Sequence, residues 1–137
     1  MSFVLDASVT LAWFYGDEWS AERDALLSRV AVEGAWAPSH WPLEVANTLL
    51  QGVRRGRYDA RMRDAALANL AALPIAIDPE TSTRAWAEAL DLAARHALTV
   101  YDACYLELAM RRGLPLATMD RALRVAAEAE GVPLLGM

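Results

Sequence analysis

Two aspartates bracket one predicted helix-strand unit, and carboxylates placed in this way could bind a cation. Asp102 lies in the first turn of a helix that we predict over residues 100–112, with Thr99 as its N-cap. The apolar run 114–118 then predicts a short buried strand, and Asp120 follows it directly. In an open parallel sheet, ligands bind beyond the carboxyl ends of the strands, where the next helices also begin. We therefore expect both aspartates at that edge.

Two further acids are expected to reach the same edge. Asp6 ends a predicted first strand over residues 2–6, and Glu44 lies near the start of a helix predicted over residues 40–55. Four carboxylates at one place repel each other unless a cation neutralises them or protons are taken up. Oxygen ligands without histidine or cysteine suit Mg²⁺ or Mn²⁺.

Each acid, taken alone, also has a structural explanation that is the more common one. Asp6 could form an Asx-turn at a strand end, and Asp102 could be the acidic half of a capping box with Thr99. Asp120 could be the N-cap of the last helix, and Glu44 a solvated charge on a helix face. Only the joint pattern favours a metal site over these explanations.

Five apolar runs alternate with helical segments, which predicts an α/β fold with a short parallel central sheet and helices on both faces. Serines are the expected N-caps of two helices, Ser8 for a helix over 9–15 and Ser39 for the helix over 40–55. The pair Gly16–Asp17 is expected to separate the first two helices. The predicted strands are 2–6, 35–38, 74–78, 114–118 and 132–135; the predicted helices are 9–15, 18–32, 40–55, 58–73, 79–96, 100–112 and 120–130.

Composition limits the possible functions. A chain of 137 residues with 55% hydrophobic content predicts one domain over residues 1–137. Its net charge of -5 excludes nucleic-acid binding by overall charge, so a polyanion would have to be bound locally. All 13 basic residues are arginine, which excludes P-loop and Schiff-base chemistry. The lone Cys104, with no signal peptide and no membrane-spanning apolar run, predicts a cytoplasmic protein.

Four ordered segments resemble the PIN-domain ribonucleases, and most closely the VapC-type toxins of toxin-antitoxin pairs. The segments are VLDAS at 4–8, PLEVAN at 42–47, LTVYDACYLELA at 98–109 and LPLATMD at 114–120. The resemblance implies a single PIN-like domain in which the catalytic and metal-binding acids are Asp6, Glu44, Asp102 and Asp120. It also implies supporting roles for Ser8, Asn47 and Thr118.

The resemblance implies a metal-dependent ribonuclease that acts as a toxin, with Mg²⁺ or alternatively Mn²⁺ as its cofactor. Hydrolysis of a phosphodiester needs an activated water and relief of charge on the leaving oxygen, and carboxylate-held metals supply both. No general-base histidine is needed, so we expect His40 and His96 to be structural or surface residues. RNA is then the substrate, and a cognate antitoxin and a second copy of the chain are the expected partners.

Four arginines are the expected substrate-binding residues, although solvated helix ends would explain each of them as well: Arg54, Arg55, Arg57 and Arg121. No readable motif identifies the RNA target. A non-catalytic PIN-like module that binds RNA or protein is the main alternative function. A metal-dependent phosphatase of the haloacid-dehalogenase type is less favoured, because it needs a second aspartate where Ser8 stands and a lysine that this chain lacks.

Overall fold

A five-stranded parallel sheet forms the centre of the molecule, as the sequence predicted. The computed structural model describes residues 2–15 and 20–136, so the predicted break at Gly16–Asp17 and helix start at Glu18 lie outside the described residues. The strand order is β3-β2-β1-β4-β5, and every pair is parallel. The strands are β1 (Val4–Leu5), β2 (Ala35–Ala37), β3 (Ile75–Ile77), β4 (Leu116–Ala117) and β5 (Leu134–Leu135).

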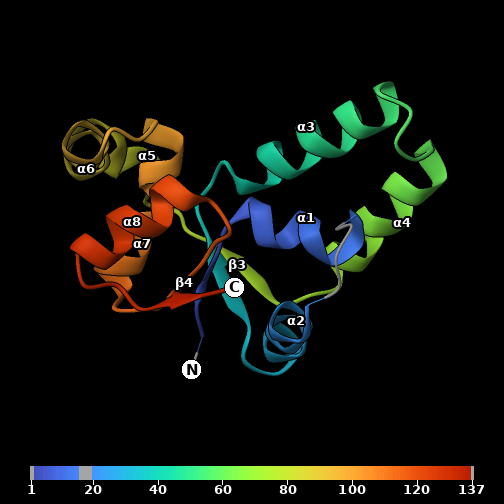
Figure 1. Ribbon diagram of the computed structural model, residues 1–137, viewed down its shortest axis with the longest axis horizontal. Helices are drawn as coiled ribbons and strands as arrows, with labels where there is room; N and C mark the ends of the chain where they lie inside the picture. Colours follow the sequence, from blue (N-terminus) through green and yellow to red (C-terminus); the bar gives the residue numbers. More distant parts are fainter. Residues whose placement is uncertain (1, 16–19, 137) are drawn as a thin grey trace.

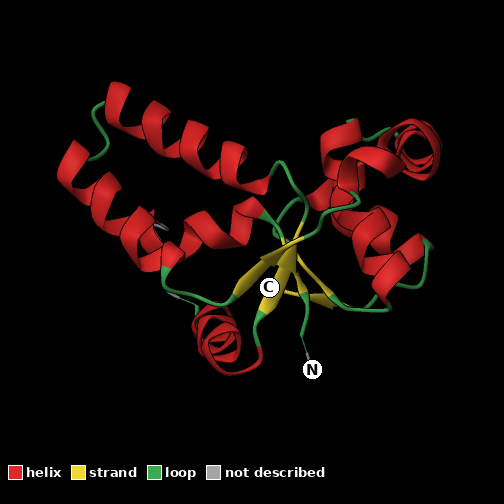
Figure 2. Cartoon of the chain, turned by 180° about the vertical axis from the view of Figure 1, so that it is seen from behind, coloured by secondary structure: helices red, strands yellow, loops and turns green. Residues whose placement is uncertain are grey.

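Helices flank this sheet on both sides (Figures 1 and 2). One group contains α1 (Ala7–Tyr15), α2 (Ala21–Glu33), α3 (Trp41–Arg54) and α4 (Ala60–Ala71). The other contains α5 (Thr81–Arg84), the π-helical turn η1 (Ala85–Ala89), α6 (Leu90–His96), α7 (Val100–Arg112) and α8 (Arg121–Ala129). The single helix predicted over 79–96 is thus a helical stretch whose middle turn is π-helical. No helix in the described ranges is long and apolar enough to cross a membrane.

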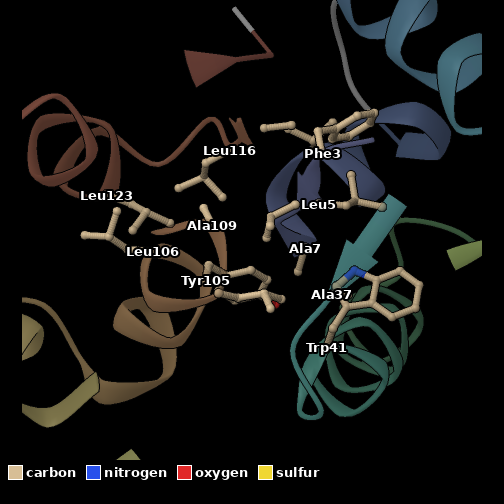
Figure 3. Close-up of a cluster of buried hydrophobic side chains, with 14 of the residues drawn as sticks. Phe3, Leu5, Ala7, Ala37, Trp41, Tyr105, Leu106, Ala109, Leu116 and Leu123 are labelled. Carbon is tan, nitrogen blue, oxygen red and sulfur yellow. The ribbon is translucent and has the colours of Figure 1, made fainter. Parts of the chain in front are cut away.

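Helix α7 lies in the core rather than on it. Its residues 103–109 are all buried, and Tyr105, Leu106 and Ala109 pack towards Leu116 and Leu5 of the sheet (Figure 3). A helix surrounded by apolar neighbours on most sides has few alternative positions, because any shift would open voids in a close-packed interior. The burial of α7 therefore fixes the place of Asp102 in its first turn.

The pairing of β1 with β4 places two functional segments side by side. Leu5 pairs with Ala117, and the Asp6 amide donates to the Ala117 carbonyl at 3.0 Å. Asp6 and Thr118 therefore leave their strands at the same point of the carboxyl edge. The sheet extends in opposite directions from here, to β2 and β3 on one side and to β4 and β5 on the other. Such a switch point is where open α/β sheets bind ligands.

Two predicted N-caps are confirmed, because the side chains of Thr99 and Asp120 each accept a hydrogen bond from the backbone three residues on. Two predicted caps are wrong. Helix α1 already begins at Ala7, so Ser8 lies inside its first turn. His40 precedes α3, and the backbone amide of Ser39 instead donates to Thr81 Oγ1.

A buried hydrogen bond fixes the start of α3 against α1. Trp41 Nε1 donates to Thr10 Oγ1 at 3.1 Å, and that hydroxyl donates in turn to the Asp6 carbonyl at 3.2 Å. Both hydroxyl and indole are buried, so breaking the contact would leave an unsatisfied polar group in the core. The contact holds the first turn of α3, which carries Glu44, close to the end of β1.

Candidate active site

Asp6 is the most enclosed acid of the predicted site. Its residue surface is only 5% exposed, and its Oδ2 accepts hydrogen bonds from Ser8 Oγ and Thr118 Oγ1, both at 2.7 Å. Ser8 comes from the first turn of α1 and Thr118 from the end of β4, so the strand pairing described above brings the donors together. The carboxylate is therefore fixed in orientation by two hydroxyls.

Burial raises the pKa of Asp6 from its ordinary value of 3.8 to about 6. The two hydroxyl hydrogen bonds, from Thr118 and Ser8, lower it, whereas the negative charges of Glu44 and Asp102 raise it further. Glu44 and Asp102 therefore lie within electrostatic reach of Asp6, because charges are weakly screened in a partly buried site.

The same two hydroxyls also hold the segment that carries Asp120. Ser8 Oγ accepts from the Met119 amide, and Thr118 Oγ1 accepts from the Asp120 amide, both at 3.0 Å. Asp120 caps α8 through Oδ1, which accepts from the Leu123 amide at 2.9 Å. Its structural explanation is therefore correct, but capping occupies one oxygen only, and a carboxylate can accept further bonds or a cation through the other.

Glu44 is positioned by two ring-bearing side chains. The Tyr105 hydroxyl donates to Glu44 Oε1 at 3.1 Å, and His40 Nε2 lies 2.9 Å from the same oxygen. His40 Nε2 is also 2.9 Å from the Tyr101 carbonyl, which can only accept, so this nitrogen carries the proton. Sequence reasoning missed both roles. The spacing could have indicated Tyr105, since it follows Asp102 by three residues on one helix face.

Asp102 is half-buried in the first turn of α7. Burial raises its pKa, and the negative charges of Asp120 and Glu44 raise it further, while a hydrogen bond from Thr99 partly offsets these effects. The charge of Asp120 thus acts on Asp102, and the charge of Asp102 acts on Asp6. With Asn47 and Glu44, it also lines a surface depression of about 430 Å³ between α3 and α7.

Other buried carboxylates of this protein are neutralised by arginine. Arg111 donates to Asp78 Oδ2 at 2.7 Å and to Glu107 Oε1 at 2.7 Å. Burial alone would raise the pKa of Asp78, but the bonds from Arg111 and Thr81 outweigh it, and this pKa lies below its ordinary value. In residues 2–15 and 20–136, no arginine makes an ion pair with any of three site acids: Asp6, Asp102 and Asp120.

The donor set suits a hydrated divalent cation. In the described part of the chain, no three Asp, Glu, His or Cys side chains are arranged so that together they could hold a metal ion. Mg²⁺ does not require such a cage, because it usually keeps several waters and binds through one or two carboxylates plus substrate phosphates. Asp6 and Asp102, whose pKa values are raised and which have no arginine partner in the described part of the chain, meet that requirement.

The expected substrate arginines lie in two places. Arg55 and Arg57 line a groove of about 190 Å³ between α1 and α3, which Ser8 also lines. Arg54 does not line it, and Arg121 is exposed at the start of α8, directly after Asp120. Gly52, inside α3, leaves room for the Tyr58 ring, since any Cβ there would overlap it.

The PIN domain family model matches residues 3–129. Two relatives are each named Ribonuclease VapC3. The one from Pyrobaculum aerophilum is 31% identical over 123 residues, which cover 90% of this chain and 92% of the relative. The one from Mycobacterium tuberculosis is 37% identical over 124 residues, which cover 88% of this chain and 83% of the relative.

Solved structures agree on the fold. PAE2754 from Pyrobaculum aerophilum superimposes with a TM-score of 0.67 at 26% identity, over 98% of this chain and 83% of that one. A toxin-antitoxin complex from Klebsiella pneumoniae matches with a TM-score of 0.57 at 18% identity, over 86% of each chain. From its match to the family model and its identity to these relatives over most of their length, the chain belongs to the PIN domain family and, within it, to the VapC group.

Proposed function

We propose that this protein is a metal-dependent ribonuclease, the toxin of a toxin-antitoxin pair, which hydrolyses RNA phosphodiester bonds. One observation carries the proposal: Asp6 and Asp102, at the switch point of the sheet, have raised pKa values and no arginine partner among the described residues, whereas Asp78 elsewhere is paired with Arg111. A protein keeps such an unfavourable arrangement where function requires it. The relatives' name, Ribonuclease VapC3, supports the same activity.

Four acids are the proposed ligands of Mg²⁺ or Mn²⁺, directly or through water: Asp6, Glu44, Asp102 and Asp120. When bound, the cation lowers the pKa of a water and stabilises charge on the leaving oxygen. Ser8 and Thr118 orient the Asp6 carboxylate through their hydroxyls, and Tyr105 orients Glu44. Asn47 lines the same depression, and contact of its amide with substrate is part of the proposal.

Substrate phosphates are the proposed partners of four arginines: Arg54, Arg55, Arg57 and Arg121. Because the protein as a whole is acidic, RNA must be held by local positive charge. The groove that Arg55 and Arg57 share with Ser8 supports this, since it connects these cations to the neighbourhood of Asp6. The cytoplasm is the proposed location.

An antitoxin protein and a second copy of the chain are the proposed partners. The fold likeness to a chain of a toxin-antitoxin complex and the VapC relatives support the first. The homodimer rests on resemblance to the family alone. Co-purification from the native host tests the antitoxin, and recovery of no small partner protein would contradict it. Light scattering tests the homodimer, and a monomer would contradict that.

Cleavage of RNA tests the proposed activity. Purified protein is incubated with total RNA in Mg²⁺ or Mn²⁺, or in EDTA, and the cleavage sites are mapped. We expect cleavage with either metal, none in EDTA, and none with Asp102→Asn. Binding of RNA without cleavage under all conditions would contradict the proposal and favour a non-catalytic binding module.

A further inference from the structure

Two large apolar side chains border the depression beside Glu44 and Asp102. Leu43, in the first turn of α3, is 73% exposed, and Tyr101, in the first turn of α7, is 68% exposed. Both line this depression of about 430 Å³. Neither side chain contributes to the buried core, so packing does not explain their presence there.

The backbone behind the Tyr101 ring is held in place. The Tyr101 carbonyl accepts a hydrogen bond from His40 Nε2 at 2.9 Å, and the two rings lie 5.8 Å apart between centroids. Tyr101 also belongs to α7, the helix fixed by burial in the core. A ring presented in this way loses little conformational freedom when it stacks on a ligand, which favours binding.

The surroundings of the ring favour a flat, neutral ligand with polar edges. Glu44 and Asp102 line the depression and can accept hydrogen bonds from the amino or imino groups of a ligand, and Asn47 offers an amide donor and acceptor. Nucleobases have this character, and bases of single-stranded RNA stack on exposed aromatic side chains. The depression lies next to the acids that are proposed to act on an RNA phosphodiester. A base of that same RNA strand is therefore the ligand that fits it.

We propose that Tyr101 and Leu43 hold one nucleobase of single-stranded RNA beside the phosphate that is cleaved. The proposal rests on the ribonuclease function proposed above and adds a base-binding site to it. Tyr101 supplies the stacking surface and Leu43 the opposite apolar wall. Because stacking tolerates any base, this site fixes the position of the RNA strand. Any preference for one base comes from the Asn47 amide.

A base-deletion experiment tests the site. The probes are a single-stranded oligoribonucleotide that spans a mapped cleavage site and a series in which one position at a time is abasic. We expect one abasic position to lower kcat/KM of the wild type by about tenfold, the usual size of one base-aromatic contact. Tyr101→Ala should lower kcat/KM about tenfold on the intact probe and cause no further decrease on that abasic probe.

Two variants control for unrelated effects. Tyr101→Phe keeps the stacking ring, so it should rescue the decrease in kcat/KM that Tyr101→Ala causes. Trp86→Ala removes an aromatic side chain that is 92% exposed on η1 and lines no part of this depression, so its kcat/KM should not change. Circular dichroism and melting temperature confirm that each variant folds.

Two results would overturn the base site. The first is a Tyr101→Ala variant that cleaves the intact probe like the wild type. The second is a Tyr101→Ala variant whose kcat/KM falls about tenfold further on the abasic probe, so that the effects of the variant and of the missing base multiply. If neither the wild type nor Tyr101→Ala cleaves the probe, the ribonuclease function is contradicted instead. The base site is then tested by fluorescence anisotropy with the same labelled probes, where Tyr101→Ala must weaken binding about tenfold and unchanged binding refutes it. If Tyr101→Ala instead abolishes capture of a co-purifying protein with no effect on these probes, the surface binds protein and the base site is refuted.

Discussion

The hydroxyl of Tyr105 donates a hydrogen bond to Glu44 Oε1 across 3.1 Å and so connects α7 to α3 at the site. Burial raises the pKa of this hydroxyl, and the nearby charges of Asp6 and Glu44 raise it further. Tyr105 therefore stays protonated and donates throughout the physiological pH range. The ring is fully buried, so the donor has no other position available.

Tyr105→Phe removes this donor and leaves the ring in place. We expect kcat/KM for RNA cleavage to fall about tenfold, because Glu44 is no longer held, and stability to fall by only about 1 kcal/mol, the usual worth of one hydrogen bond. Cleavage assays and thermal melts measure the two effects. His40→Gln serves as a companion variant, since its amide N–H can replace His40 Nε2, whereas His40→Ala cannot. Unchanged kcat/KM in Tyr105→Phe would show that Glu44 needs no positioning.

Thr118→Val tests the hydroxyl shared by Asp6 and Asp120. Valine fills the same space but leaves the Asp120 amide without its acceptor and Asp6 with one donor fewer. We expect a decrease of about 1–3 kcal/mol in the free energy of unfolding, together with reduced cleavage, because an unsatisfied buried group is costly. Thr118→Ser keeps the hydroxyl and should restore both. Denaturant unfolding of the three proteins decides, and a valine variant as stable as the serine variant would contradict this role.

Asn substitutions at Asp6, Asp102 and Asp120 should each abolish metal-dependent cleavage while the fold survives. Each removes one negative charge from the cluster, which weakens cation binding and relieves repulsion, so stability should hold or rise. Asn is also a good N-cap, so Asp120→Asn keeps the cap of α8. Glu128→Gln, an exposed acid near the other end of that helix, is the matched control. Wild-type cleavage by any of the three Asn variants would remove that residue from the site.

Arg55→Gln and Arg57→Gln should weaken RNA binding without affecting the metal. The affinity should become less dependent on salt, because a protein that neutralises fewer phosphates displaces fewer counterions when it binds RNA. Stability should be unchanged, since both side chains are exposed. Arg63→Gln is the control, because Arg63 pairs with Asp64 on α4 and does not line the groove. Anisotropy at several salt concentrations measures the slopes, and equal slopes for all proteins would exclude these arginines.

Much of the architecture was predictable because local signals agreed. The five apolar runs each gave a strand, and Thr99 and Asp120 have the capping chemistry that their positions suggest. The caps at Ser8 and Ser39 could not be predicted correctly, because tertiary contacts decide there. Ser8 instead bonds to Asp6 and to Met119, which is 111 residues away.

The positioning residues were hidden for a related reason. His40 has no local signature, and only the packing of α3 against α7 brings it to Glu44 and Tyr101. The ion pair between Arg111 and Asp78 likewise spans 33 residues, and it distinguishes a neutralised buried acid from the unneutralised acids of the site. Residue types and spacing can indicate which acids matter, but not which partners hold them.

The raised pKa of Asp6 predicts how pH and metal act together on stability. Its pKa is about 6 in the folded protein and ordinarily 3.8, so the unfolded chain ionises first as pH rises. The contribution of this group to the free energy of unfolding is therefore greatest below pH 3.8. It decreases as the pH rises through 6, and at pH 7 it is lower by about 3 kcal/mol. A bound cation favours the ionised form and removes that decrease.

A thermal melt with and without Mn²⁺ across about pH 5 to 8, the range where perturbed carboxylates titrate, tests the shared cation site most directly. The control is Asp6→Asn, which should show a smaller response to Mn²⁺ and a smaller dependence of that response on pH. We expect Mn²⁺ to raise the wild-type melting temperature more at about pH 7–8 than at about pH 5. An increase that is equal at all pH values, or no increase, would show that the acids share no cation site and would remove the physical basis of the proposed ribonuclease.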